Sequence, residues 1–115
     1  GKPIRDFIYA GDCADGMIHM VENGVTDPVN LGSGDGVSIK EVAEAIRDCY
    51  NKDVEIEWDI TKPKGDARRL MDTSRAESNG FACSTHLVDG IRETLQWFLK
   101  NRDLYKKRNN YFVKD

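Results

Sequence analysis

The chain has 115 residues, of which 39% are hydrophobic and 32% charged, with a formal net charge of −3 and a pI near 5.4. This length suits one domain, or part of one, with a single hydrophobic core. The acidic balance argues against a general nucleic-acid-binding surface, although a local basic cluster can still hold a phosphorylated small molecule.

The first part of the chain predicts a strand followed by a helix. Residues 4–9, IRDFIY, have the aromatic and β-branched content of a strand. Ala10 and Gly11 break this strand, and Asp12 is then placed to cap a helix that ends at the left-handed stop Asn23-Gly24. One face of the predicted helix carries Ala14, Met17, Ile18 and Val21.

Residues 29–50, VNLGSGDGVSIKEVAEAIRDCY, form the unit around which the rest is organised. They predict a buried strand at residues 29–31, a glycine-rich turn and an amphipathic helix that ends near Tyr50. Ser38 and Glu41 have the spacing of a capping box, which sets the start of the helix. A glycine-rich turn before a helix also suggests phosphate binding. We interpret it as structural, because Val37 stands where G-x-G-x-x-G requires its third glycine.

The second half continues the alternation of strands and helices. Residues 54–58 alternate apolar and acidic side chains, as a half-buried strand does. A connection rich in turn formers follows at residues 61–67, then an extended piece at 68–72. A brief helix is expected from about Thr73 to Asn79-Gly80, and a long helix from near Thr85. This order predicts an α/β or α+β fold.

The cysteines, histidines and tryptophans suggest little chemistry. Cys13, Cys49 and Cys83 lie far apart without a C-x-x-C pair, so neither a disulfide framework nor a zinc site is expected. His19 and His86 have no partner at ligand spacing, and we expect no metal site. Trp58 and Trp97 fall on apolar faces and are expected in the core. With no membrane-spanning run and no signal peptide visible, we expect a cytoplasmic protein.

Five blocks of sequence then carry a resemblance to a known family. They are RDFIY with GDCA at residues 5–14, VNLGSG at 29–34, VSIKE at 37–41, TKPKG with RRLMD at 61–72, and GIRET with WFL at 90–99. In order and spacing they resemble the C-terminal part of the extended short-chain dehydrogenase/reductase family, the NAD-dependent sugar-nucleotide epimerases, dehydratases and reductases. The last two blocks are most similar to the GDP-L-fucose synthase branch. One departure is Ala10-Gly11, where the family usually carries a second acidic residue and a valine.

The resemblance implies a C-terminal segment of a Rossmann-type NAD(P)-binding fold, with short strands alternating with helices. Such enzymes bind NAD or NADP through a glycine-rich turn and use a Tyr-x-x-x-Lys pair, both upstream of the matched segment. Residues 1–115 are therefore expected to be a single substrate-binding segment with no cofactor-binding or catalytic residue, inactive alone.

The resemblance also nominates substrate-binding residues. In the family, the arginine matching Arg5 and basic residues matching 62–69 approach the nucleotide diphosphate, which nominates Arg5, Lys62, Arg68 and Arg69. Because Arg68 and Arg69 point to opposite sides of an extended piece, at most one of them faces the ligand. The alternative is that all four are solvated surface charges.

The expected function is the GDP- or UDP-hexose-binding portion of an NAD(P)-dependent epimerase or reductase. The full-length parent is expected to be similar to GDP-L-fucose synthase. The alternatives are a segment of a UDP-hexose 4-epimerase or 4,6-dehydratase, and a stand-alone binding or interaction module without catalysis. Without the cofactor domain, a helix face and a strand edge lack a partner. We therefore expect a homodimer, or docking onto the missing N-terminal domain, through Met17, Ile18, Val21 and the edge at residues 29–31.

Overall fold

A computed structural model describes residues 1–50, 53–63 and 65–106. Strands and helices alternate along the chain up to its last two elements, which are both helices, and the α/β class that the sequence predicts is confirmed. The elements are β1 (Ile4–Asp6), α1 (Ala10–Glu22), β2 (Gly36–Ser38), α2 (Ile39–Tyr50), β3 (Arg68–Arg69), α3 (Ser74–Ser78) and α4 (Leu87–Lys106).

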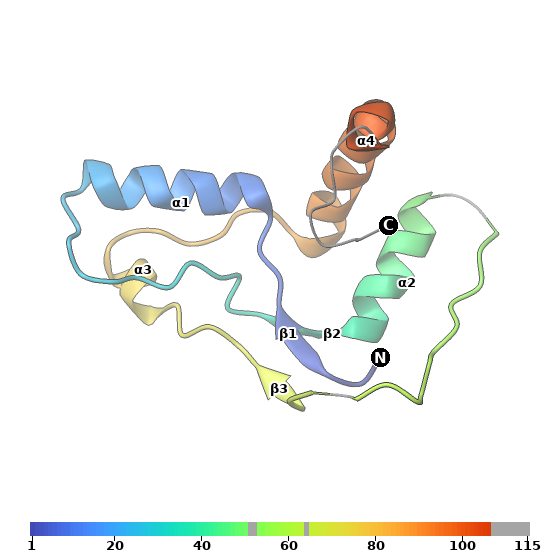
Figure 1. Ribbon diagram of the computed structural model, residues 1–115. Coiled ribbons are helices and arrows are strands. Elements are labelled where there is room, and N and C mark those ends of the chain that lie inside the picture. The colour runs from blue at the N-terminus through green and yellow to red at the C-terminus, as the bar shows by residue number, and fades with distance from the viewer. Residues whose placement is uncertain (51–52, 64, 107–115) are drawn as a thin grey trace.

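The three short strands form one sheet in the order β2-β1-β3. β1 runs antiparallel to β2, with Ile4 opposite Ser38, and parallel to β3, with Arg5 opposite Arg69. In Figure 1, α2 and α4 lie to one side of the sheet, while α1 extends away from them on the other. α2 and α4 pack against each other. The sheet therefore joins two separate groups of helices.

The start of α1 differs from the prediction. The helix begins at Ala10, where the sequence predicted a break, and Tyr9 is the N-cap residue with extended backbone (φ −66°, ψ 137°) and no side-chain cap. Asp12 lies inside the first turn, and its side chain is turned toward the segment before α4 rather than toward its own helix. The C-terminal stop is confirmed, since Gly24 has a φ of +66°.

The capping box at the start of α2 is confirmed. The Ser38 N–H donates to Glu41 Oε2 at 2.7 Å, and the Glu41 N–H donates to Ser38 Oγ at 3.1 Å. The Ile39 and Lys40 amides donate to the carbonyls of Pro3 and Gly1, both at 3.0 Å. The first amides of this helix are therefore bonded within the chain.

Three strand predictions are wrong in position or extent. β1 ends at Asp6 instead of Tyr9, and residues 29–31 and 54–58 are not strands. Residues 29–31 instead form a loop beside α1 and α3, where Asn30 Nδ2 donates to the Asp72 carbonyl at 3.3 Å. Apolar alternation gives side chains a common face, but a strand also needs a neighbouring backbone to bond, and among the described residues these two segments have none.

The later helices agree with the prediction to within two residues. α3 ends at Ser78 with Asn79 as its C-cap residue, and Gly80 has a φ of +82°. α4 begins at Leu87, two residues beyond the predicted start near Thr85. None of the helices within the described ranges combines the length and the apolar character that crossing a membrane requires.

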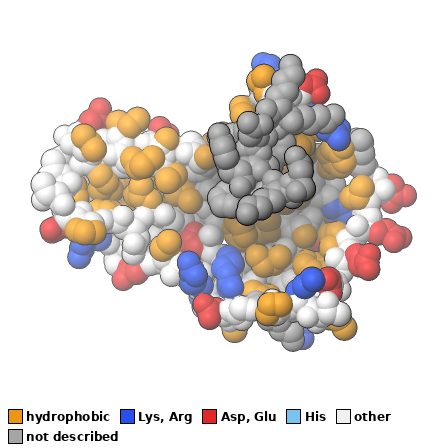
Figure 2. Space-filling view, in the orientation of Figure 1, with side chains coloured by type: hydrophobic (Ala, Val, Ile, Leu, Met, Phe, Trp, Pro, Cys, Tyr) orange, Lys and Arg blue, Asp and Glu red, His pale blue; other side chains and the backbone are white. Residues whose placement is uncertain are grey.

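The apolar core is small. Of the hydrophobic side chains in the described residues, only Met20 and Ala76 are buried. The prediction that both tryptophans are core residues is wrong, because Trp58 is 39% exposed and Trp97 is 63% exposed. Apolar side chains are also exposed along α1 in Figure 2. The periodicity of a helix shows which face is apolar, but only other parts of a protein can cover that face.

Candidate functional site

The sheet register brings two of the four nominated residues onto the same face. Arg5 in β1 is opposite Arg69 in β3, and paired residues of neighbouring strands point to the same side of a sheet. Arg68 is opposite Ile4 and therefore lies on the other side. The structure thus separates Arg68 from Arg69, as the extended backbone predicts. Figure 2 shows Lys and Arg side chains gathered around this part of the surface.

The guanidinium of Arg5 fastens β1 to the segment that leads into β3. Its Nη1 donates to the Ile4 carbonyl at 2.7 Å and its Nη2 to the Asp66 carbonyl at 2.9 Å. The Ile4 N–H adds a bond to the Ala67 carbonyl at 2.9 Å. Arg5 is half-buried and keeps further N–H donors beyond these two bonds.

The other nominated side chains are exposed to solvent. Lys62, Arg68 and Arg69 are exposed, and within the described part of the chain their side chains make no hydrogen bond or ion pair. Lys62 follows a turn in which Asp59 Oδ1 accepts the N–H and hydroxyl of Thr61, at 3.0 and 2.6 Å. Residue 64, also basic, lies outside the described residues. Exposed, unpaired cations near a fixed arginine can bind an anion.

A carboxylate that the sequence analysis did not single out, Asp6, organises the backbone beside Arg5 and Arg69. Asp6 Oδ1 accepts the N–H and the hydroxyl of Ser33, at 2.8 and 2.7 Å. Asp6 Oδ2 accepts the N–H of Gly34 at 3.3 Å and that of Met71 at 3.4 Å. Burial raises the pKa of the Asp6 carboxyl, but the hydrogen bonds from Ser33, Met71 and Gly34 together lower it more. The pKa therefore lies below its ordinary value and Asp6 is charged.

The only signal for Asp6 in the sequence is its place next to Arg5 within the predicted strand at residues 4–9. Its partners lie 27 to 65 residues further along the chain. Gly32 is needed for this approach, since a Cβ there would lie 2.6 Å from Asp6 Oδ2 and 2.9 Å from Met71 Cβ. The glycines of this loop therefore allow close packing around a carboxylate.

The same loop does not fit a dinucleotide cofactor. The Ser33 and Gly34 amides, which could otherwise bind a phosphate, already bind Asp6. The amides at the start of α2 are bonded to Glu41, Pro3 and Gly1. Neither set is available to a pyrophosphate, so we derive no cofactor chemistry from these residues.

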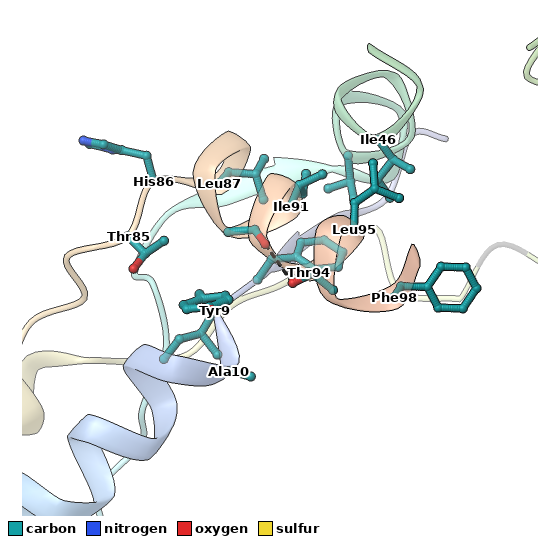
Figure 3. A pocket seen from close by; sticks show the side chains of 14 residues that line it. Tyr9, Ala10, Ile46, Thr85, His86, Leu87, Ile91, Thr94, Leu95 and Phe98 are labelled. Atoms are coloured by element: carbon teal, nitrogen blue, oxygen red, sulfur yellow. Dashed lines mark hydrogen bonds between the residues drawn. The ribbon is translucent and has the colours of Figure 1, made fainter. Parts of the chain in front are cut away.

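An apolar groove lies between the start of α1, α2 and α4. Its volume is about 490 Å³. Figure 3 shows Tyr9 and Ala10 on one side of it and Ile91, Leu95 and other residues of α4 on the other. The hydroxyl of Thr94 in the groove donates to the carbonyl of Gly90 in its own helix, at 2.7 Å. The described residues that line the groove are mostly apolar, so it is suited to covering by apolar side chains rather than to catalysis.

Two further titratable groups, His19 and Cys83, have structural partners. His19 Nε2 is 2.8 Å from the Asn79 carbonyl oxygen, and its ring lies 5.9 Å from that of Phe81. Cys83 Sγ donates to the Gly32 carbonyl at 2.9 Å, and burial together with the charges of Asp12 and Asp6 raises the pKa of this thiol. Across the described ranges, no group of three or more His, Cys, Asp or Glu side chains is arranged to hold a metal ion.

Comparison with known proteins connects this arrangement to a family. No model of a known protein family matches the chain. GDP-L-fucose synthase 1 of Arabidopsis thaliana is 37% identical over 102 residues, which are 88% of this chain and 32% of that protein. A crystal structure of a GDP-6-OMe-4-keto-L-xylo-heptose reductase from C. jejuni matches with a TM-score of 0.75 and 29% identity, over 87% of this chain and 32% of its own. The chain is related to a segment of the nucleotide-sugar epimerase and reductase family.

A second solved structure extends this relation to UDP-sugar enzymes. UDP-glucose 4-epimerase from Bifidobacterium longum, in complex with NAD+ and UDP, matches with a TM-score of 0.75 and 26% identity, over 89% of this chain and 32% of its own. The chain spans about a third of the length of the curated relatives it matches. The resemblance to the extended short-chain dehydrogenase/reductases is confirmed, and with it the relation to GDP-L-fucose synthases.

Proposed function

We propose that this chain is the nucleotide-sugar-binding portion of an NAD(P)-dependent epimerase or reductase similar to GDP-L-fucose synthase. The observation that carries the proposal is the parallel register of β1 and β3, which sets Arg5 and Arg69 side by side on one face. The relatives support it, because GDP-L-fucose synthases and a GDP-heptose reductase are among the proteins that the chain matches.

The ligand group suited to this face is the diphosphate of a GDP- or UDP-hexose. Two guanidinium groups on one face present planar pairs of donors that match phosphate oxygens. Lys62, on the exposed connection before β3, can add a third cation. Arg68 lies on the opposite side of the sheet and has no part in the same diphosphate contact.

The hydride chemistry belongs to the longer protein that this proposal implies. NAD or NADP, when bound there, would supply hydride transfer at a hexose carbon, with the hydride taken up and returned in an epimerase and donated by the reduced cofactor in a reductase. We propose that the cofactor binds outside the present residues, since the backbone amides of the glycine-rich loop and of the α2 N-terminus are bonded internally. Residues 1–115 then contribute binding and orientation of the substrate, without a catalytic residue or a metal of their own.

We propose two partners for the exposed apolar surfaces: the cofactor-binding part of the longer protein, or a second copy of this chain when that part is lacking. Met17, Ile18 and Val21 on α1 are 55%, 56% and 79% exposed, although all three are apolar.

The three cysteines are unpaired, which suits a reducing compartment and supports a cytoplasmic location for the whole protein.

A segment of a UDP-hexose 4-epimerase or 4,6-dehydratase is the second candidate. It is favoured by the structural match to UDP-glucose 4-epimerase, which has the same TM-score as the match to the GDP-heptose reductase. A stand-alone binding module is the third. Sequencing the gene upstream of the codon for Gly1 distinguishes the stand-alone module from the two enzyme candidates. A G-x-x-G-x-x-G turn and a Tyr-x-x-x-Lys pair encoded there would support an enzyme.

Titration of the chain with GDP-mannose, UDP-glucose and NADPH, followed by NMR, tests the proposal. We expect weak binding of a nucleotide sugar, lost when Arg5→Ala is combined with Arg69→Ala and kept in Arg102→Ala, an exposed arginine of α4. We expect no binding of NADPH. If neither sugar nucleotide binds, or if the double variant binds as well as the wild type, the proposed substrate site is wrong; micromolar affinity for NADPH would overturn the placement of the cofactor elsewhere.

A further inference from the structure

Two adjacent residues of β1 hold the segment that carries Arg68 and Arg69. Arg5 bonds the carbonyl of Asp66, before β3, and Asp6 bonds the N–H of Met71, after β3, at 2.9 and 3.4 Å. The strand between these two bonds is only two residues long. Such a short strand has too few ladder hydrogen bonds to define its own register, so the bonds at its two ends decide it.

Asp6 also connects this segment to a third part of the chain. Its Oδ2 accepts the amides of both Met71 and Gly34, while its Oδ1 accepts both donors of Ser33. Asp6 lies one residue after Arg5 and so points to the opposite side of the strand. It is therefore placed to orient the ligand-binding face without contacting a ligand on that face.

From this geometry we infer that Asp6 is a positioning residue, which keeps Arg69 in register with Arg5 for binding of the diphosphate. This inference rests on the proposed function. It assigns to the carboxylate a task that an amide of the same shape cannot perform. All of its partners are donors, and in Asp6→Asn one of the two side-chain atoms becomes a donor that opposes either Ser33 or the Gly34 and Met71 amides.

The test compares Asp6→Asn with Asp12→Asn in the 115-residue chain. Asp12 is a matched control, because its buried carboxylate also accepts backbone and hydroxyl donors, from Thr85 and Ser84, but at the start of α1. Affinity for GDP-mannose and for UDP-glucose is measured by NMR titration, and cross-strand NOEs between residues 5 and 69 report the register. Ser33→Ala, which removes only one of the bonds to Asp6, serves as a milder variant if Asp6→Asn does not fold.

We expect Asp6→Asn to weaken sugar-nucleotide binding about tenfold and to remove the NOEs between residues 5 and 69, while Asp12→Asn changes neither. We also expect Asp6→Asn to have no further effect in the Arg69→Ala background, because it acts through that arginine. Ser33→Ala should weaken binding less than Asp6→Asn does.

Three outcomes overturn the inference: unchanged binding in Asp6→Asn, an equal loss in Asp12→Asn, or additive losses with Arg69→Ala. If the wild-type chain binds no sugar nucleotide, the proposed function fails, and the NOEs decide the register separately. NOEs that persist in Asp6→Asn would then show that Asp6 does not position Arg69.

Discussion

Asp12 in the first turn of α1 and Thr85 just before α4 are joined by two hydrogen bonds, although they are 73 residues apart in sequence. Asp12 Oδ2 accepts the Thr85 N–H at 2.9 Å, and Oδ1 accepts the Thr85 hydroxyl at 2.8 Å. Asp12 is 6% exposed. This pair fixes where α4 starts relative to α1, and Thr85 itself lines the apolar groove.

Asp12 should make the stability of the chain depend on pH. Burial raises the pKa of its carboxyl, but the bonds from Thr85 and Ser84 lower it more, so the folded pKa lies below the unfolded value. A depressed pKa stabilises the folded state above the unfolded value of about 3.9, and this stability is lost as the pH falls through the folded pKa. Urea unfolding between pH 7 and pH 2 measures it.

In the same experiment we expect Asp12→Asn to lower the free energy of unfolding by about 1–3 kcal/mol at pH 7 and to flatten the acid dependence. Asp15→Asn, on the exposed side of the same helix, is the control and should have little effect. An Asp12→Asn variant as stable as the wild type at pH 7 would show that the bonds to Thr85 do not hold α1 and α4 together.

The capping box of α2 should contribute measurably to stability. Ser38→Ala removes the acceptor for the Glu41 N–H and is expected to cost about 1 kcal/mol, as loss of an N-cap does. Urea unfolding followed by circular dichroism checks this. Ser78→Ala, whose exposed hydroxyl donates to the Ser74 carbonyl of its own short helix, should cost less. Equal losses in the two variants would argue against a special role for Ser38.

Gly16 should not tolerate a larger residue, although it lies within a helix. A Cβ at this position would lie 2.8 Å from Phe81 Cζ and 3.0 Å from Leu31 Cδ2. We therefore expect Gly16→Ala to lower the free energy of unfolding by about 1–3 kcal/mol, even though alanine favours helices by about 1 kcal/mol. The reverse exchange at an exposed position, Ala14→Gly, measures the propensity term alone. A stabilised Gly16→Ala would show that α1 and the segments around Phe81 and Leu31 are not in close contact.

The exposed apolar face of α1 should cause self-association of the isolated chain. Light scattering at micromolar concentration is expected to give the mass of a dimer, because burying this face removes apolar area from water. Replacing Ile18 and Val21 by Glu should yield a monomer, while Glu22→Gln, at the border of the same face, should leave the dimer intact. A wild-type chain that is a cooperatively unfolding monomer would contradict the expectation.

The sequence by itself determined the parts that depend on neighbours three or four residues apart. Ser38 and Glu41 set the start of α2, and Gly24 and Gly80 end their helices, because caps and left-handed stops are satisfied within one turn of the chain. The order of five short blocks was also sufficient to indicate the family, since it required no knowledge of contacts.

Only the tertiary structure decided the strands and the partners of the buried carboxylates. The glycine-rich stretch supplies β2 at Gly36–Ser38, whereas the more apolar residues 29–31 form a loop. Asp6 and Asp12 bind donors from distant segments, and the pairing of Arg5 with Arg69 depends on a strand of two residues. The physical reason is that a strand or a buried carboxylate is satisfied by whichever backbone lies beside it, and the chain's path through space, not the local pattern, brings that backbone there.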